Sequence, residues 1–291
     1  MHRDSGVMEC MRIDASLARS LVARQFPKWA GLPVTPVLPG GIDNRTFRLG
    51  DELAIRMPSA EGYAASVAKE QRWLPVIARG VPLPVPLPVA EGAPDEGYPL
   101  PWSVNRWLPG EPALSAPVAD TGRFARDLAE FLLALQSVDT TGAPLAGAHS
   151  FFRGADPVHY DDETRRAIHE LGDAIDGPLA LRIWEDGLTA RWRGSPVWFH
   201  GDVAPGNLLV RDGELSSVID FGTSGVGDPA CDLYIAWTFF DPAARSAFRI
   251  AMGADDAMWA RGRAWTLWKA LITHNIDVYK TIVDDHAADH G

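Results

Sequence analysis

An Asp-Gly pair at 212–213 divides the stretch FHGDVAPGNLLVRDGELSSVIDFG, residues 199–222, into two short apolar runs. Asp-Gly between apolar segments is among the strongest short-range signals for a β-hairpin. Three polar side chains flank these runs: Asp202 and Asn207 come before the first run, and Asp220 follows the second. The chain must therefore fold so that one hairpin carries two acids and an amide beside its ends.

The strand register predicts where these side chains lie. If Arg211 pairs with Glu214 across the turn, Asn207 falls opposite Val218. Side chains two residues apart share a face of a strand, so Asp220 should lie on the face of Asn207. Such diagonal neighbours are about 7–8 Å apart at Cα. An amide oxygen and a carboxylate at that spacing can converge on Mg²⁺, which takes few protein oxygens and completes its shell with water and phosphate.

The order of the three side chains is typical of phosphoryl transfer. Asp202 precedes Asn207 by five residues, and D-F-G follows at 220–222. In protein kinases the Asp of D-x-x-x-x-N accepts the hydroxyl proton, while the Asn and the DFG Asp hold Mg²⁺. The alternative, that both acids are ordinary turn and capping residues, leaves the combined spacing unexplained.

The rest of the chain changes character along its length. Strand-like segments dominate the first third and helical patterns the remainder. Proline at every second position in 81–89 predicts an extended edge segment with its Val and Leu row facing inward. Pro109-Gly110 is the candidate domain boundary. The predicted helices are 13–26, 63–79, 121–138 and 258–279, the last with Trp265 and Trp268 in the core.

Several segments resemble the aminoglycoside phosphotransferase family of protein-kinase-like small-molecule phosphotransferases. HGDVAPGNLLV resembles its catalytic loop, and VIDFGTSGVGDPACDL its metal-binding segment. GGIDNRTFRLGDELAIRMP, VAKEQRWLP and YPLPWSVNRWLPGE resemble its N-terminal lobe. The resemblance covers residues 34–275. It implies an α+β, bilobal kinase-like fold, with a β-rich nucleotide-binding lobe over 1–108 and a mostly helical lobe over 109–291 that holds the catalytic loop and acceptor site.

The resemblance also implies roles for individual residues. Asp202 would be the catalytic base, Asn207 and Asp220 the Mg²⁺ ligands, and His200 a support for the loop. ATP or GTP would be the phosphoryl donor. The N-terminal candidates are Gly40, Gly41 and Asn44 in a hairpin over the phosphates, Arg56 with its partner Glu70, and Asn105, Arg106 and Trp107 in the hinge.

Two positions depart from the usual pattern. Arg56 stands where many kinases have Lys, but it keeps a cation there and arginine binds phosphate through a bidentate fork. Ala204 replaces a His that many members carry, and no metal ligand is lost. A catalytically weak, nucleotide-binding pseudokinase that acts through partners is the alternative; Arg56 favours it weakly, whereas the intact Asp202, Asn207 and Asp220 oppose it.

The acceptor is expected to be a small hydroxylated molecule. Gly201 replaces the Arg of a kinase H-R-D, and the segment 222–227 is too short to dock a peptide. The loop 151–163 is expected to border the acceptor site. The sequence does not distinguish an aminoglycoside, another antibiotic or a metabolite as the acceptor, and it does not establish antibiotic resistance. Six acids in the helical part could attract a cationic sugar, although each is more typically a solvated helix or loop residue. They are Asp161, Asp162, Glu163, Glu185, Asp186 and Asp241.

Charge and hydropathy limit the other partners. The formal net charge of −11 disfavours nucleic acid, which needs Lys and Arg surfaces. No run of about 18 apolar residues predicts a membrane span. The N-terminal segment lacks the apolar core of a signal peptide, so we expect a cytoplasmic protein, either monomer or homodimer.

Overall fold

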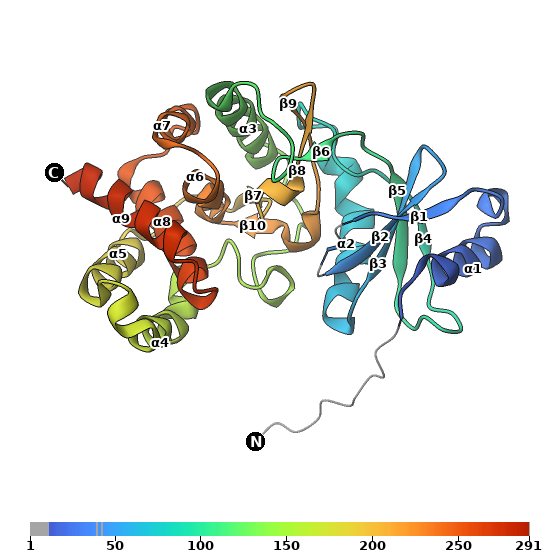
Figure 1. The fold of residues 1–291 in the computed structure, drawn as a ribbon, viewed down its shortest axis with the longest axis horizontal. Helices are drawn as coiled ribbons and strands as arrows, with labels where there is room; N and C mark the ends of the chain where they lie inside the picture. Colours follow the sequence, from blue (N-terminus) through green and yellow to red (C-terminus); the bar gives the residue numbers. More distant parts are fainter. Residues whose placement is uncertain (1–11, 39, 42, 291) are drawn as a thin grey trace, which may run out of the picture. The chain divides into compact units, whose positions relative to one another are not determined.

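The computed structural model describes residues 12–38, 40–41 and 43–290. They form two compact units (Figure 1): unit 1 runs up to Pro75 and includes Val85–Leu108, and unit 2 comprises Val76–Pro84 and the chain from Pro109 onward. The segment 76–84 thus belongs to unit 2. The predicted single boundary after residue 108 does not include this exchange. The N-terminal segment used to argue against a signal peptide lies, over residues 1–11, outside the described residues.

Unit 1 is built on an antiparallel sheet with strand order β1-β2-β3-β5-β4. Gly50 turns the chain between β2 and β3 with a φ of 60°, a left-handed conformation that glycine adopts without a Cβ clash. The predicted hairpin strands are therefore present. The strands are β1 (Val34–Pro36), β2 (Asn44–Leu49), β3 (Leu53–Pro58), β4 (Pro88–Gly92) and β5 (Trp102–Arg106).

The proline-rich segment does reach the sheet edge, since β4 is the outermost strand. The prediction that the Val and Leu side chains of this segment face inward is wrong, however. Leu87 and Val89 are 40% and 37% exposed, and only Val85 is buried. Because proline has no N–H to donate, the ladder begins only at Pro88, the last proline of the run.

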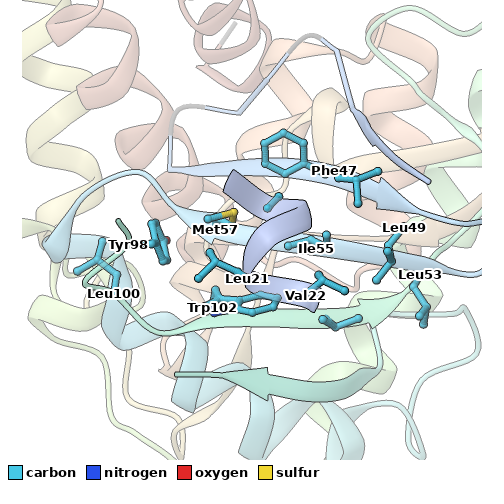
Figure 2. Packing of buried hydrophobic residues seen from close by; sticks show 13 residues of the cluster. Leu21, Val22, Phe47, Leu49, Leu53, Ile55, Met57, Tyr98, Leu100 and Trp102 are labelled. Carbon is cyan, nitrogen blue, oxygen red and sulfur yellow. The ribbon is translucent and has the colours of Figure 1, made fainter. Parts of the chain in front are cut away.

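One face of this sheet is covered by α1 (Ala15–Gln25). Asp14 caps the helix by accepting hydrogen bonds from the N–H groups of Ser16 and Leu17. Figure 2 shows Leu21 and Val22 of this helix among the sheet residues of the buried cluster, which include Ile55 and Trp102. This helix and sheet face give unit 1 its core.

The other face of the sheet faces α2 (Glu61–Ile77), which Figure 1 draws on the side opposite α1. Alternation along β3 and β5 turns Arg56, Ser103 and Asn105 away from the α1 core. The candidate cation Arg56, Ser103 and the hinge residue Asn105 therefore share the α2 face.

Unit 2 is mostly helical around α8 (Asp256–Ile272), which packs against α4, α5 and α9. Trp265 and Trp268 are buried, as predicted. The predicted single helix 258–279 is wrong, because the chain breaks at His274 (φ 54°) and Asn275 then accepts the Val278 N–H. The remaining helices are α3 (Thr121–Gln136), α4 (Asp161–Leu171), α5 (Gly177–Thr189), α6 (Ile235–Thr238), α7 (Pro242–Ala251) and α9 (Ile276–His290).

Two small sheets complete unit 2. One has the order β6-β8-β9, and the other pairs β7 with β10. None of the helices in the described ranges has the length and apolar content that crossing a bilayer requires. The strands are β6 (Glu111–Pro112), β7 (Val197–Phe199), β8 (Leu208–Arg211), β9 (Glu214–Val218) and β10 (Gly225–Gly227).

Candidate active site

The predicted hairpin is present, but its register differs from the prediction. Strands β8 and β9 are joined at Asp212 and Gly213, and Arg211 pairs with Glu214 as expected. The register then shifts by one residue, so that Leu208 lies opposite Val218. A β-bulge adds the extra residue on β9. The expected pairing of Asn207 with Val218 is therefore wrong; Asn207 instead accepts the Ile219 N–H through its carbonyl, at 2.9 Å.

Because of this register shift, strand alternation does not determine where the two candidate metal ligands, Asn207 and Asp220, lie. Asn207 ends a short 3₁₀ turn, Pro205–Asn207, before β8 begins. Asp220 follows β9 with a φ of 67°, in the left-handed region. Non-glycine residues rarely adopt this conformation, which costs about 1–3 kcal/mol and persists only where the surrounding structure enforces it. The backbone hydrogen bond from the Ile219 N–H to the Asn207 carbonyl holds the residue before Asp220 beside the catalytic loop.

Asp202 and Asn207 are in direct contact. The Asn207 Nδ2 group donates to Asp202 Oδ2 at 2.8 Å and to the Asp202 carbonyl at 2.9 Å. These bonds fix the orientation of the amide, so its Oδ1 faces away from Asp202. Within the described residues, no donor is hydrogen-bonded to that oxygen. The structure thus joins the candidate base to one candidate metal ligand.

His200 connects the catalytic loop to the segment around Asp220. Its ring is fully buried, with Nε2 3.0 Å from the Ile219 carbonyl and Nδ1 accepting the Asp202 N–H at 3.2 Å. This pattern assigns the neutral tautomer with the proton on Nε2. The ring also packs edge-on against Phe221, with centroids 4.6 Å apart. The supporting role expected of His200 therefore has a physical basis.

Asp232 is a site residue that the sequence reasoning missed. Its carboxylate is 1% exposed and accepts the N–H groups of His200 at 2.8 Å and Gly201 at 2.7 Å. Burial raises the pKa of this carboxyl group. The only signal was the second Asp of DPACDL, 30 residues from Asp202. The first, Asp228, caps the following turn as expected and also binds Arg261 at 2.7 Å.

A small cavity lies beside Asp202 within unit 2. Its volume is about 60 Å³, and Arg153 brings the expected acceptor loop, 151–163, to its wall. Its lining residues are Arg153, Gly201, Asp202, Ala204, Cys231, Tyr234, Trp265, Trp268 and Lys269.

The six acids considered for a cationic acceptor are not among that lining. Five of them have partners elsewhere in unit 2. Asp161 and Glu163 accept indole N–H groups, Glu185 pairs with Arg165, Asp186 pairs with His286, and Asp241 caps α7.

The Arg56–Glu70 ion pair is formed in unit 1. Arg56 Nη1 lies 3.1 and 3.3 Å from the two carboxylate oxygens of Glu70, and the side chains are 12% and 6% exposed. On the same face, Ser103 Oγ and both amide atoms of Asn105 are buried without a hydrogen-bond partner among the described residues. Such orphaned polar atoms are typical of a surface that a ligand or water completes.

The hinge N–H groups of Arg106 and Trp107 are already engaged. Arg106 N–H donates to the Leu87 carbonyl and Trp107 N–H to the Glu52 carbonyl, each at 2.8 Å. Only carbonyls and side chains of these two residues are left to contact a base.

In the glycine-containing turn, one side chain contacts the backbone. The Arg45 guanidinium binds the Gly41 carbonyl, and a Cβ at Gly41 would lie 3.2 Å from the Asn44 carbonyl. Gly40 is not crowded, and Asn44 is buried at the start of β2. These residues belong to unit 1, whereas Asp202, Asn207 and Asp220 belong to unit 2.

Both the sequence and the fold of this chain are similar to those of known proteins. The model of the phosphotransferase enzyme family matches residues 34–265. No curated protein sequence matches the chain significantly. Among solved structures, the GDP and kanamycin complex of APH(2")-IIia has a TM-score of 0.68 at 18% identity, covering 94% of this chain and 99% of that one.

Two further structures are also similar. Macrolide 2'-phosphotransferase MphH from Brachybacterium faecium, an apoenzyme, has a TM-score of 0.61 at 22% identity and covers 94% of both chains. The streptomycin-ATP-APH(2")-IIa ternary complex has a TM-score of 0.59 at 16% identity, covering 90% of this chain and 91% of that one. The α+β kinase-like fold expected from the sequence, with a β-rich N-terminal part and a helical C-terminal part, is confirmed.

Proposed function

This chain belongs to the phosphotransferase enzyme family, and we propose that it transfers the γ-phosphoryl group of ATP or GTP to a hydroxyl of a small molecule, with Mg²⁺. The contact between Asp202 and Asn207, with Asp220 held nearby through His200 and Ile219, carries this proposal. The similar solved structures named above include complexes with GDP and with ATP, which supports a nucleotide donor.

Asp202 would orient the acceptor hydroxyl and take its proton. Its Oδ2 accepts from Asn207, and its Oδ1 receives no hydrogen bond from the described residues. Asp202 also lines the small cavity. The hydroxyl oxygen would form a bond to the γ-phosphorus, the bond from that phosphorus to the β,γ-bridging oxygen would break, and ADP or GDP would leave.

Asn207 Oδ1 and the Asp220 carboxylate would hold the magnesium ion. Two oxygen donors fit Mg²⁺, which usually relies on substrate phosphates and water for the rest of its shell. Across the described part of the chain, no group of three or more His, Cys, Asp and Glu side chains offers a protein-only metal cage. When bound, the ion supplies positive charge that offsets the phosphate charge.

The unit 1 candidates would bind the nucleotide. Glu70 holds Arg56 on β3, where its guanidinium could engage phosphate oxygens. Ser103 and Asn105 lie on the same sheet face as Arg56, with buried polar atoms that have no partner among the described residues. Gly40, Gly41 and Asn44 are proposed to cover the phosphates.

The test is the melting temperature with ATP or GTP, each with and without Mg²⁺. We expect one nucleotide to raise the melting temperature only when Mg²⁺ is present. Asp220→Ala should abolish that metal dependence, whereas Asp202→Ala should keep it and lose acceptor-dependent ADP or GDP release. Asp173→Ala, which changes an exposed acid of the turn after α4, is the matched control.

Two results would contradict the proposal. Strong residual turnover by Asp202→Ala would remove Asp202 as the base. Metal-dependent nucleotide binding by the wild type, without turnover on any acceptor, would instead support the pseudokinase alternative.

A further inference from the structure

The cavity beside Asp202 has a positively charged wall. Arg153 and Lys269 both line it, and both lie near the Trp268 ring, with Arg153 Cζ 4.9 Å and Lys269 Nζ 6.0 Å from the ring centroid. Arg153 is half-buried, and within the described ranges it forms no ion pair. The guanidinium of Arg153 donates one long hydrogen bond, of 3.5 Å, to the Phe151 carbonyl. Its guanidinium fork therefore keeps most of its donors for a ligand.

The acids near the cavity already have hydrogen-bond or ion-pair partners. Asp202 is the only acid in the lining, and it accepts from Asn207. Glu163 accepts the Trp268 indole N–H at 2.7 Å. The buried Asp232 accepts two backbone N–H groups of the catalytic loop, and Asp228 is paired with Arg261. The lining itself therefore holds two cationic side chains, Arg153 and Lys269, and one carboxylate, while the surrounding acids keep their charge but have their oxygens engaged.

The Trp268 ring of the wall is not open to an organic cation. Such cages bind ammonium groups over the faces of Trp and Tyr rings. Here Tyr160 stacks on Trp268, with centroids 4.0 Å apart and planes at 22°, and Arg153 lies over the same indole. A cationic ligand would have to displace Arg153 and would be repelled by it.

We propose that the acceptor of this chain carries an anionic group, a carboxylate or a phosphate, close to the hydroxyl that is phosphorylated, and that Arg153 binds that group. This inference rests on the proposed function, because it takes Asp202 as the site of the reacting hydroxyl. Arginine forms bidentate, charge-assisted hydrogen bonds with such groups. The cavity, about 60 Å³, is also small beside the roughly 300–1,000 Å³ of drug-sized sites, so the group that enters it is small.

Three matched probes test the charge preference: mandelate, 1-phenylethane-1,2-diol and 2-amino-1-phenylethanol. They share a phenyl ring and a benzylic hydroxyl, and differ in a carboxylate, a neutral hydroxyl or an ammonium group. We expect calorimetric titration of the wild type, without nucleotide, to give at least tenfold tighter binding of mandelate than of the amine. The preference should weaken as salt is added, since the interaction is between charges.

Variants assign the preference to Arg153. Arg153→Met should weaken mandelate binding about tenfold and leave the neutral diol within twofold, whereas Arg153→Lys should keep part of the preference. Arg166→Met, at an exposed arginine of α4, is the matched control and should change nothing. Equal binding of mandelate and the amine by the wild type would overturn the proposal. An equal loss for all three probes in Arg153→Met would overturn it as well, because Arg153 would then act on the fold rather than on charge.

The two proposals fail in different experiments. The probe titrations need neither nucleotide nor metal, whereas the proposed function is tested by Mg²⁺-dependent nucleotide binding. A chain that binds nucleotide with Mg²⁺ but prefers the amine refutes only the anionic acceptor. A chain that prefers mandelate but binds no nucleotide refutes the phosphotransferase role, and only an anion-binding site at Arg153 is then left.

Discussion

The catalytic loop depends on one buried carboxylate, Asp232, which accepts two backbone N–H groups through its two oxygens. In Asp232→Asn, one oxygen becomes an NH₂ group that faces an N–H donor. A hydrogen bond to a charged group contributes about 1.5–3 kcal/mol, so we expect turnover to fall roughly 10- to 100-fold. Acceptor-dependent ADP or GDP release measures the effect, and Asp173→Asn, at an exposed acid, is the control. Unchanged turnover would show that the loop does not need this anchor.

The Arg56–Glu70 pair allows a similar argument about stability. Removing one partner of a buried ion pair costs about 3–5 kcal/mol, because the other charge stays buried. We expect Arg56→Met to lower the free energy of unfolding by about 3 kcal/mol, and Arg56→Met/Glu70→Leu to recover much of that loss. Urea unfolding measures both.

A surface pair on the same sheet provides the control for this prediction. Arg106 and Glu52 are 3.3 Å apart but 56% and 81% exposed. Arg106→Met should therefore change the free energy of unfolding by less than about 1 kcal/mol. If the two arginine variants lose equal stability, burial of the Arg56–Glu70 pair is not what matters.

At the scale of elements, short-range signals predicted the presence of β8 and β9 but not their exact pairing. Asp-Gly at 212–213 specifies the turn, because both positions need a positive φ. The bulge that shifts the register has no such signature in ELSSV. The split between α8 and α9 is similar, since the apolar spacing continues through His274 while the backbone reverses there. The Asn275 side chain that caps α9 is the one local mark of that break.

The docking of α9 should respond to pH. Burial acts to raise the pKa of Asp289, but hydrogen bonds from Arg263 and Arg249 outweigh it, and the net pKa is lowered. A lowered pKa means that the stabilisation is present above the ordinary aspartate pKa of about 3.9 and is lost as pH falls through the folded-state pKa. We expect Asp289→Asn to cost about 1 kcal/mol or less at pH 7, and nothing at the lowest pH where the protein stays folded.

Urea unfolding at several pH values measures this difference. Asp277→Asn is the control on the same helix, because Asp277 is 97% exposed and lies 3.9 Å from Lys280. A cost for Asp289→Asn that stays the same from pH 7 to below the aspartate range would contradict the ion-pair origin of the effect.

At the scale of the molecule, the site divides into residues that spacing predicts and residues that only the fold brings in. Asp202, Asn207 and Asp220 lie within 19 residues, so a motif could find them. Asp232 and Arg153 reach the same loop and cavity from other segments, and neither belongs to a short pattern. The Arg56–Glu70 pair lies between these cases, because a strand followed by a helix predicts it.

The last prediction concerns the two units together. The proposed nucleotide contacts fall in both, with Arg56 on β3 in unit 1 and Asn207 and Asp220 in unit 2. If one nucleotide uses both sets, adding Mg²⁺ and the preferred nucleotide should slow amide hydrogen exchange in β3 and also in the 200–207 loop. Asp220→Asn should reduce the protection of both segments, and EDTA should do the same in the wild type. Protection confined to one unit would mean that the nucleotide contacts only that unit, and the residues proposed in the other would have to be given up.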